Sequence, residues 1–214
     1  MVPPETYGNC AVTDAHDPVD QRLHSQGLPL PGMRIRAVDP VSREALSADE
    51  AGELVVEGYV TPGYYRAPEL DAAAFAESGG FLTGDLGSID RDGRVRFRGR
   101  LKEMIKTGGI NVAPLEVEEV LLQHPEIVQA HVVGVPDAAK GEIVAAAVEP
   151  RPGAAADAAA IVAFCRDRLA SYKVPVLLAF YTADQLPRTP TGKIHKPSLA
   201  DAFAAERGDD AGSG

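Results

Sequence analysis

The chain has 214 residues, of which 45% are hydrophobic and 24% are charged, a composition typical of a folded protein with room for one or two domains. Its formal net charge is −10, which argues against non-specific binding to nucleic acid, because such binding needs a basic surface. The two cysteines, Cys10 and Cys165, make no disulfide framework, and the five histidines show no spacing typical of a zinc site.

The sequence also contains no signal for membrane insertion. No positively charged segment followed by an apolar run opens the chain, and no apolar run approaches the roughly 18 residues of a membrane-spanning helix. We therefore expect a cytoplasmic protein without a membrane span.

The first hundred residues have the pattern of a β-rich subdomain. Adjacent prolines make the first dozen residues irregular and extended. Apolar residues alternate with basic ones over 33–38, and a short apolar run at 52–58 lies between glycines, so both predict strands. We expect a short helix near 68–75, and a hairpin turning at Asp92-Gly93.

Residues 98–109 separate this region from the rest of the chain. Gly99 is followed by three charged residues, an apolar pair, and then the pair Gly108-Gly109. A polar segment flanked by glycines between two patterned regions predicts a domain boundary. A solvated hairpin followed by a loop is the alternative interpretation.

The remaining sequence predicts a compact mixed domain. Pro114 begins a helix in which Val117, Val120 and Leu121 recur on one face. Apolar runs predict strands at 127–135, 142–148 and 176–181, and the Ala-rich segment 154–169 predicts a helix. The fold class is therefore α+β, with a β-rich subdomain (1–101), a mixed α/β domain (102–200) and a disordered tail (201–214).

Two residues are candidates for a ligand site from their local sequence alone. Asp85 follows a short apolar strand in Thr83-Gly84-Asp85, where its carboxylate could accept both hydrogens of a ribose diol; a turn-capping aspartate is the alternative. Lys193 lies at the tip of the turn-rich segment 186–194, although an ordinary exposed lysine is the common reading.

The segment 99–111, GRLKEMIKTGGIN, resembles the hinge motif of the adenylate-forming (AMP-binding) superfamily, which contains the acyl- and aryl-CoA synthetases. Four further matches occur in the family's order: Glu5-Thr6, the Gly-Glu-Leu run at 52–54, Thr83-Gly84-Asp85, and the segment 186–194. Together they cover nearly the whole chain. The set is specific because the order is kept, whereas any one of these motifs alone is weak.

The resemblance implies a two-step reaction. Family members use ATP and Mg²⁺ to convert a carboxylic acid into an acyl-adenylate with release of pyrophosphate. The C-terminal domain then rotates about the hinge, and the thiol of coenzyme A attacks. Such ligases also act in fatty acid metabolism. The implied partners are a small carboxylic acid, ATP and coenzyme A. The resemblance also implies a role for each matching residue: Lys193 would be the catalytic lysine, Asp85 and Arg100 would bind the nucleotide, and Lys102 would be the hinge. Gly108 and Gly109 would bind coenzyme A, and Glu5 would bind Mg²⁺.

The family's phosphate-binding loop is missing from these 214 residues, because no glycine-rich, Ser/Thr-rich loop with a lysine is present. The chain thus resembles the last third of such an enzyme, and we expect it to be inactive alone and to expose apolar surface on residues 1–101. Alternatives are a peptide-synthetase adenylation domain, a luciferase-like relative, or a non-catalytic binding module. Residues 104–112 are closer to the CoA ligases, but no motif identifies the acid.

Overall fold

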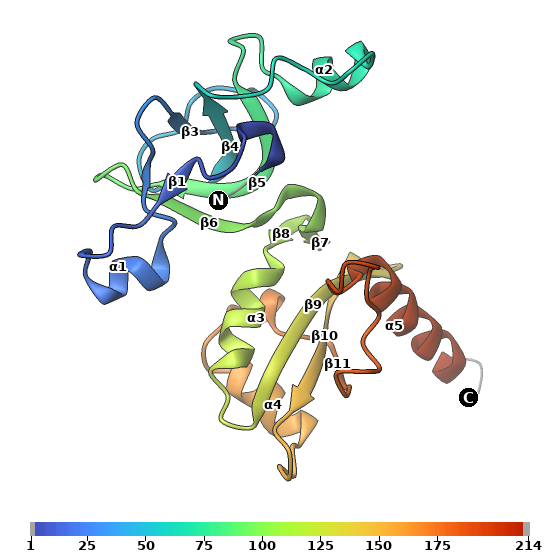
Figure 1. The fold of residues 1–214 in the computed structure, drawn as a ribbon. Helices are drawn as coiled ribbons and strands as arrows, with labels where there is room; N and C mark the ends of the chain where they lie inside the picture. The colour runs from blue at the N-terminus through green and yellow to red at the C-terminus, as the bar shows by residue number, and fades with distance from the viewer. Residues whose placement is uncertain (1–2, 212–214) are drawn as a thin grey trace. The chain divides into compact units, whose positions relative to one another are not determined.

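The computed structural model describes residues 3–211, with side chains described as far as residue 207. The chain divides into two compact units, residues 1–102 (unit 1) and residues 103–214 (unit 2). Figure 1 shows a sheet at the centre of each unit. The predicted α+β class, with a β-rich part before a mixed α/β part, is confirmed.

Unit 1 is built on a four-stranded antiparallel sheet in sequence order, with strands β3 (Arg34–Val38), β4 (Gly52–Glu57), β5 (Phe81–Ile89) and β6 (Val95–Arg100). The inner strand β4 is buried along almost all of its length. The predicted hairpin between β5 and β6 is confirmed: the carboxylate of Asp90 accepts hydrogen bonds from the N–H groups of Asp92 and Arg94 and so closes its turn.

Short elements surround this sheet. Helix α1 buries no residue: its two large apolar side chains, Val19 and Leu23, are exposed, and we did not predict this helix. Several large apolar side chains of unit 1 are exposed, including Tyr7, Val41 and Tyr65; that they form one patch stays a prediction. The elements are a 3₁₀ helix (Pro4–Thr6), the antiparallel pair β1 (Ala11–Val12) and β2 (Leu28–Pro29), α1 (Val19–His24) and α2 (Pro68–Ala74).

Unit 2 contains a five-stranded mixed sheet. Its long hairpin consists of β9 (Ile127–Asp137) and β10 (Gly141–Pro150), and β11 (Leu177–Phe180) lies parallel to β10. A second hairpin, β7 (Ile105–Thr107) and β8 (Ile110–Val112), joins the sheet where Thr107 pairs with Gly141.

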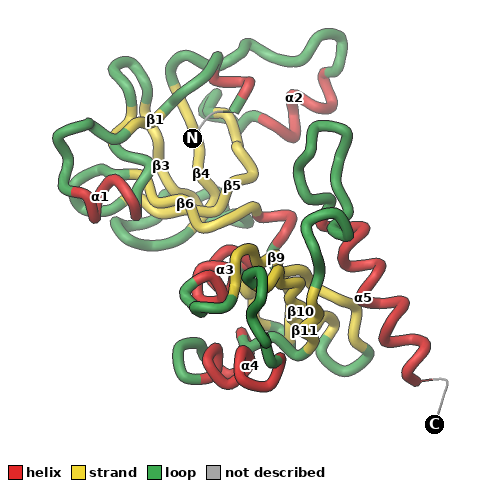
Figure 2. Tube along the Cα trace, turned by 60° about the horizontal axis from the view of Figure 1, so that its bottom comes forward, coloured by secondary structure: helices red, strands yellow, loops and turns green. Residues whose placement is uncertain are grey.

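Helices cover both faces of this sheet. Figures 1 and 2 show α3 (Pro114–Leu122) and α4 (Ala158–Arg166) on one side and α5 (Lys196–Ala211) on the other. Alternate residues of β10 therefore belong to two separate hydrophobic clusters. This is why residues 143–148 form a continuous apolar run rather than alternating with polar residues.

Two sequence predictions in unit 2 need correction. The helix expected over 154–169 covers only Ala158–Arg166, because Asp157 caps it by accepting hydrogen bonds from the N–H groups of Ala159 and Ala160. The tail expected to be disordered from residue 201 is wrong as far as Ala211, because α5 buries Phe203 against the sheet. Residues 212–214 lie outside the described residues. Among the described residues, no helix is long and apolar enough to span a bilayer.

Candidate active site

Asp85 and Arg100, both predicted to bind the nucleotide, face each other across the β5–β6 ladder. Arg100 Nε lies 2.8 Å from Asp85 Oδ1. The Asp85 side chain is 5% exposed, whereas that of Arg100 is 51% exposed. The structure therefore brings these two residues together as a buried carboxylate on β5 with a guanidinium beside it that still reaches solvent.

The backbone around Asp85 is held by its own neighbours. The buried Thr83 hydroxyl donates to Leu54 O (2.7 Å) and accepts from Asp85 N–H (3.0 Å), which ties β5 to β4 at this point. The buried Glu53 carboxylate accepts from Gly84 N–H (3.1 Å) and pairs with Arg43. The sequence predicted only a strand at this run, and the supporting role of Glu53 was missed because no local signal marks it.

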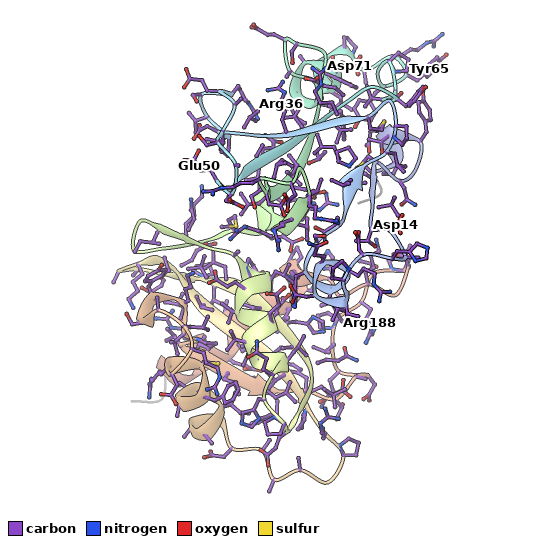
Figure 3. All side chains as sticks on the ribbon, turned by 90° about the vertical axis from the view of Figure 1, so that its left-hand side faces the viewer. Asp14, Arg36, Glu50, Tyr65, Asp71 and Arg188 are labelled. Atoms are coloured by element: carbon purple, nitrogen blue, oxygen red, sulfur yellow. The ribbon has the colours of Figure 1, made fainter. Side chains whose placement is uncertain are left out.

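Glu5 lies in the 3₁₀ helix of unit 1 and is half-buried. Its Oε1 accepts a hydrogen bond from the hydroxyl of Tyr64 (2.9 Å), and its carbonyl accepts from Thr61 N–H (2.7 Å). Burial, together with the Glu5 carboxylate, raises the pKa of Tyr64 above its ordinary value, so this phenol stays a hydrogen-bond donor. Asp71, labelled in Figure 3, holds Tyr64 in turn by accepting its backbone N–H (2.7 Å).

Tyr64 is thus a second residue that sequence reasoning missed, because it is 59 positions from Glu5 and only the tertiary fold makes them neighbours. Within the part of the chain that the structure describes, no three His, Cys, Asp or Glu side chains gather as ligands for a metal ion. Glu5 is therefore a single carboxylate, oriented by a tyrosine.

Lys102 is exposed and is the last residue of unit 1, inside a 3₁₀ helix (Leu101–Glu103). Its role as a hinge stays a prediction. Beyond it, Gly108 and Gly109 form the two-residue turn between β7 and β8, with φ values of 57° and 81°. Two consecutive positive φ angles define a type I′ hairpin turn, which explains both glycines locally. The N–H of Gly108 also donates to Lys140 O (2.8 Å).

Lys193 projects from a tight loop ahead of α5 that Figure 2 draws as an irregular connection. Thr189 N–H donates to Lys193 O (2.7 Å), Gly192 N–H donates to Thr189 O (2.8 Å), and the Thr189 hydroxyl accepts from Lys193 N–H (3.2 Å). Arg188, labelled in Figure 3, donates to Gly192 O (2.9 Å). The backbone at Lys193 is thereby fixed, while its side chain is exposed.

The base of this loop is closed by a second set of contacts. Arg188 and Ile194 form a bridge, and His195 N–H donates to Pro187 O (2.8 Å). Leu186 and Leu199, on either side of the loop, are buried in one hydrophobic cluster. The loop therefore has a packed base and an exposed lysine at its tip.

The candidate residues are divided between the two units. Glu5, Asp85, Arg100 and Lys102 belong to unit 1, whereas Gly108, Gly109 and Lys193 belong to unit 2. Within unit 1 the structure pairs Asp85 with Arg100, and it gives Glu5 a different partner, Tyr64.

One region of the chain matches a known protein family. Residues 116–193 match the family described as AMP-binding enzyme C-terminal domain, so the chain carries a domain of this family. The match ends at Lys193. The resemblance to adenylate-forming enzymes is therefore confirmed.

Curated relatives and solved structures extend the similarity beyond that domain. The chain is 40% identical to sulfoacetate–CoA ligase of Cupriavidus necator, over 88% of this chain and 36% of that protein. It is similar to the ATP-bound structure of MatB from Rhodopseudomonas palustris, with a TM-score of 0.79 and 37% identity over 85% of this chain and 36% of the other.

A third similar structure is o-succinylbenzoate CoA synthetase (MenE) of Bacillus subtilis in complex with the acyl-adenylate intermediate OSB-AMP. Its TM-score is 0.81 at 30% identity, over 92% of this chain and 39% of that one. The chain spans about a third of the length of the curated relatives it matches.

Proposed function

We propose that this chain is the C-terminal part of an ATP-dependent carboxylic acid–CoA ligase, which forms an acyl-adenylate and then an acyl-CoA thioester. The observation that carries the proposal is the Lys193 loop, in which a hydrogen-bonded turn presents an exposed lysine at the end of the matched family domain. The relatives support it, because a CoA ligase, an ATP complex and an acyl-adenylate complex occur among them.

In the adenylation step, Lys193 supplies positive charge. Attack of the carboxylate on the α-phosphate spreads negative charge over the phosphoryl oxygens and the departing pyrophosphate. A lysine ammonium is a compact point charge on a flexible stem, so it can follow that charge as it develops. Because the backbone at Lys193 is fixed, only the lysine side chain has to move to bring its ammonium to the phosphoryl oxygens.

Asp85 and Arg100 bind the nucleotide in this proposal. A carboxylate can accept both hydroxyl hydrogens of a ribose, and the guanidinium of Arg100, whose Nε lies 2.8 Å from Asp85 Oδ1, has further donors for the nucleotide. The deep burial of Asp85 means that its orientation is set before any ligand arrives.

Glu5 is the residue that would hold Mg²⁺. This ion commonly takes one or two carboxylates and fills its other positions with water and substrate phosphates, so a single half-buried carboxylate oriented by Tyr64 fits such a site. When bound, Mg²⁺ would neutralise phosphate charge.

Gly108 and Gly109 are proposed to line the path of coenzyme A after unit 2 has rotated about Lys102. A carbon atom added at the Cβ position of either glycine would have no heavy atom within 4 Å. The turn therefore presents bare backbone to open space, where an elongated thiol ligand could pass close to it.

The experiment joins this chain behind the N-terminal part of a CoA-ligase relative and compares it with the 214-residue chain alone. Pyrophosphate release is measured with ATP and a panel of carboxylic acids, and thioester formation is measured separately from synthetic acyl-adenylate and coenzyme A. We expect activity only in the joined protein. Lys193→Ala should slow adenylation by about 10²–10³-fold, as losing a charged transition-state contact does, and leave the second step unchanged.

Lys173→Ala is the matched control, since Lys173 pairs with Glu116 on α3 rather than with a residue of the loop. Equal losses in both steps for Lys193→Ala would overturn its catalytic role. Adenylation without transfer to coenzyme A would favour a peptide-synthetase or luciferase-like enzyme, and nucleotide binding without turnover would favour a binding module.

A further inference from the structure

Lys196, three residues after Lys193, lies at the centre of a three-membered ion-pair cluster within unit 2. Its Nζ is 3.0 Å from Glu118 Oε1 on α3 and 3.1 Å from Glu103 Oε2. The side chains are partly sequestered, with exposed fractions of 25% for Lys196, 13% for Glu118 and 34% for Glu103. The cluster therefore ties the start of α5 to two segments that are far from it in sequence.

Glu118 is a rigid anchor for this cluster. The same Oε1 that meets Lys196 accepts a hydrogen bond from Val132 N–H (2.8 Å), on the edge of β9 that faces away from β10. A carboxylate bonded to a sheet backbone has little freedom to follow a mobile cation. Lys196 is therefore held by Glu118 rather than the reverse.

The position of Lys196 in its helix also points to a role outside the helix. It is the first residue of α5, where a positive charge is disfavoured because helix N-termini carry partial positive charge. Helix formation alone thus gives no reason for a lysine here. The two carboxylates that converge on its ammonium do give a reason for a lysine at this position, because an ammonium has three hydrogens to donate.

The cluster connects directly to the base of the Lys193 loop. His195, next to Lys196 in the chain, closes the loop through its N–H to Pro187 O (2.8 Å). A shift of Lys196 would therefore move the closing hydrogen bond, and with it the turn that carries Lys193. Leu199 packs the following turn of α5 into the hydrophobic cluster that α5 shares with β9 and β10.

We propose that Lys196 is a positioning residue for Lys193: through Glu118 it fixes the lysine loop to α3 and β9, and through Glu103 it fixes the loop to the residue that follows Lys102. This inference rests on the proposed function, because it assigns Lys196 an effect on adenylation. It also means that the loop and the first residue after the proposed hinge move as one piece.

The first test is structural and uses the 214-residue chain without substrates. Amide hydrogen exchange is measured at Thr189, Gly192, Lys193 and His195, whose N–H groups are hydrogen-bonded within the loop. Lys196→Met keeps the apolar stem and removes the charge, and should speed this exchange by about fivefold, while Lys196→Arg should restore protection. Lys173→Met, which breaks a different Lys–Glu pair on α3, should leave it unchanged.

The second test is kinetic and uses the chain joined to the N-terminal part of a CoA-ligase relative. Lys196→Met should slow adenylation by about 10- to 100-fold, the loss expected when a reacting group is misplaced by about 1 Å, and should spare the thioester step. Because Lys196 acts through Lys193, the double variant Lys193→Ala/Lys196→Met should be no slower than Lys193→Ala alone.

The proposal would be overturned if the adenylation rate of the double variant fell by the product of the two single losses. It would also be overturned if Lys196→Met left the amide hydrogen exchange of the loop unchanged. If Lys196→Met fails to fold, Glu118→Gln replaces it, because glutamine keeps an acceptor for Val132 N–H while losing the charge that holds Lys196. Should Lys193→Ala itself have no effect, the proposed function fails, and the exchange experiment alone still decides whether Lys196 holds the loop.

Discussion

The glycine turn between β7 and β8 offers a prediction in which stability and catalysis separate. At Gly109 the backbone has φ = 81°, and a Cβ there would meet no heavy atom within 4 Å. Alanine at this position would therefore clash with nothing, and the whole cost would be that of holding an L-residue in the left-handed region. That cost is about 1–2 kcal/mol.

We expect Gly109→Ala to lower the Tm of unit 2 by about 5 °C or more, since about 1 kcal/mol corresponds to ~4–8 °C in a domain of this size. Gly109→Asn should cost less, because asparagine tolerates positive φ. Thermal unfolding followed by circular dichroism measures both. An unchanged Tm for Gly109→Ala would show that the turn does not hold this residue at positive φ.

Gly153 provides a matched control, because it also has φ = 81° and no heavy atom near a Cβ, but lies in the loop before α4. Gly153→Ala should cost the same stability. In the joined protein, Gly109→Ala should slow transfer from acyl-adenylate to coenzyme A more than adenylation, whereas Gly153→Ala should slow neither. Equal losses in both steps for Gly109→Ala would refute its place in the coenzyme A path.

Three further outcomes follow from the structure. Limited trypsin digestion should first cut after the exposed Lys102. It should spare β7 and β8, because their residues Ile105 and Val112 are buried. Protection of residues 98–104 while the rest of the chain is degraded would count against a hinge there. Phe203→Ala should lower the free energy of unfolding of unit 2 by about 3–5 kcal/mol, measured by urea unfolding, because Phe203 is 2% exposed. A change near zero would support the original expectation that the tail is disordered. Arg94, which donates to both oxygens of Asp17, lowers the pKa of that carboxyl below 3.8, so its stabilisation is present above pH 3.8 and is lost as the pH falls below it. Asp17→Asn should therefore flatten the fall in unit 1 stability between about pH 5 and pH 2, and an identical acid profile for both proteins would contradict this.

The amino-acid sequence by itself determined the order and type of the main elements. Strong local signals specify them: the alternation in β3, the Asp92-Gly93 turn after β5, Pro114 at the start of α3, and the apolar run of β10. Each depends on neighbours a few residues apart, so it can be read without the fold. The six-residue helix α1 buries no residue and is too short to show a repeated apolar pattern, and it was missed.

The candidate site was determined by the sequence only in part. Ordered motifs pointed to Asp85, Arg100 and Lys193, and the pairing of Asp85 with Arg100 could not be known before the register of β5 and β6 was seen. The tail shows the same limit. Most of residues 201–211 are small or charged, and the one aromatic residue among them, Phe203, finds a buried position only because β9, β10 and Tyr181 form a surface for it.

Only the tertiary structure decided what supports the site. Tyr64 meets Glu5 across 59 residues, and Lys196 meets Glu118 across 78. Such contacts depend on the packing of separate elements, and no local sequence pattern around a single lysine or tyrosine predicts them. The physical reason is that hydrogen bonds and ion pairs act over about 3 Å in space, whatever the separation in sequence.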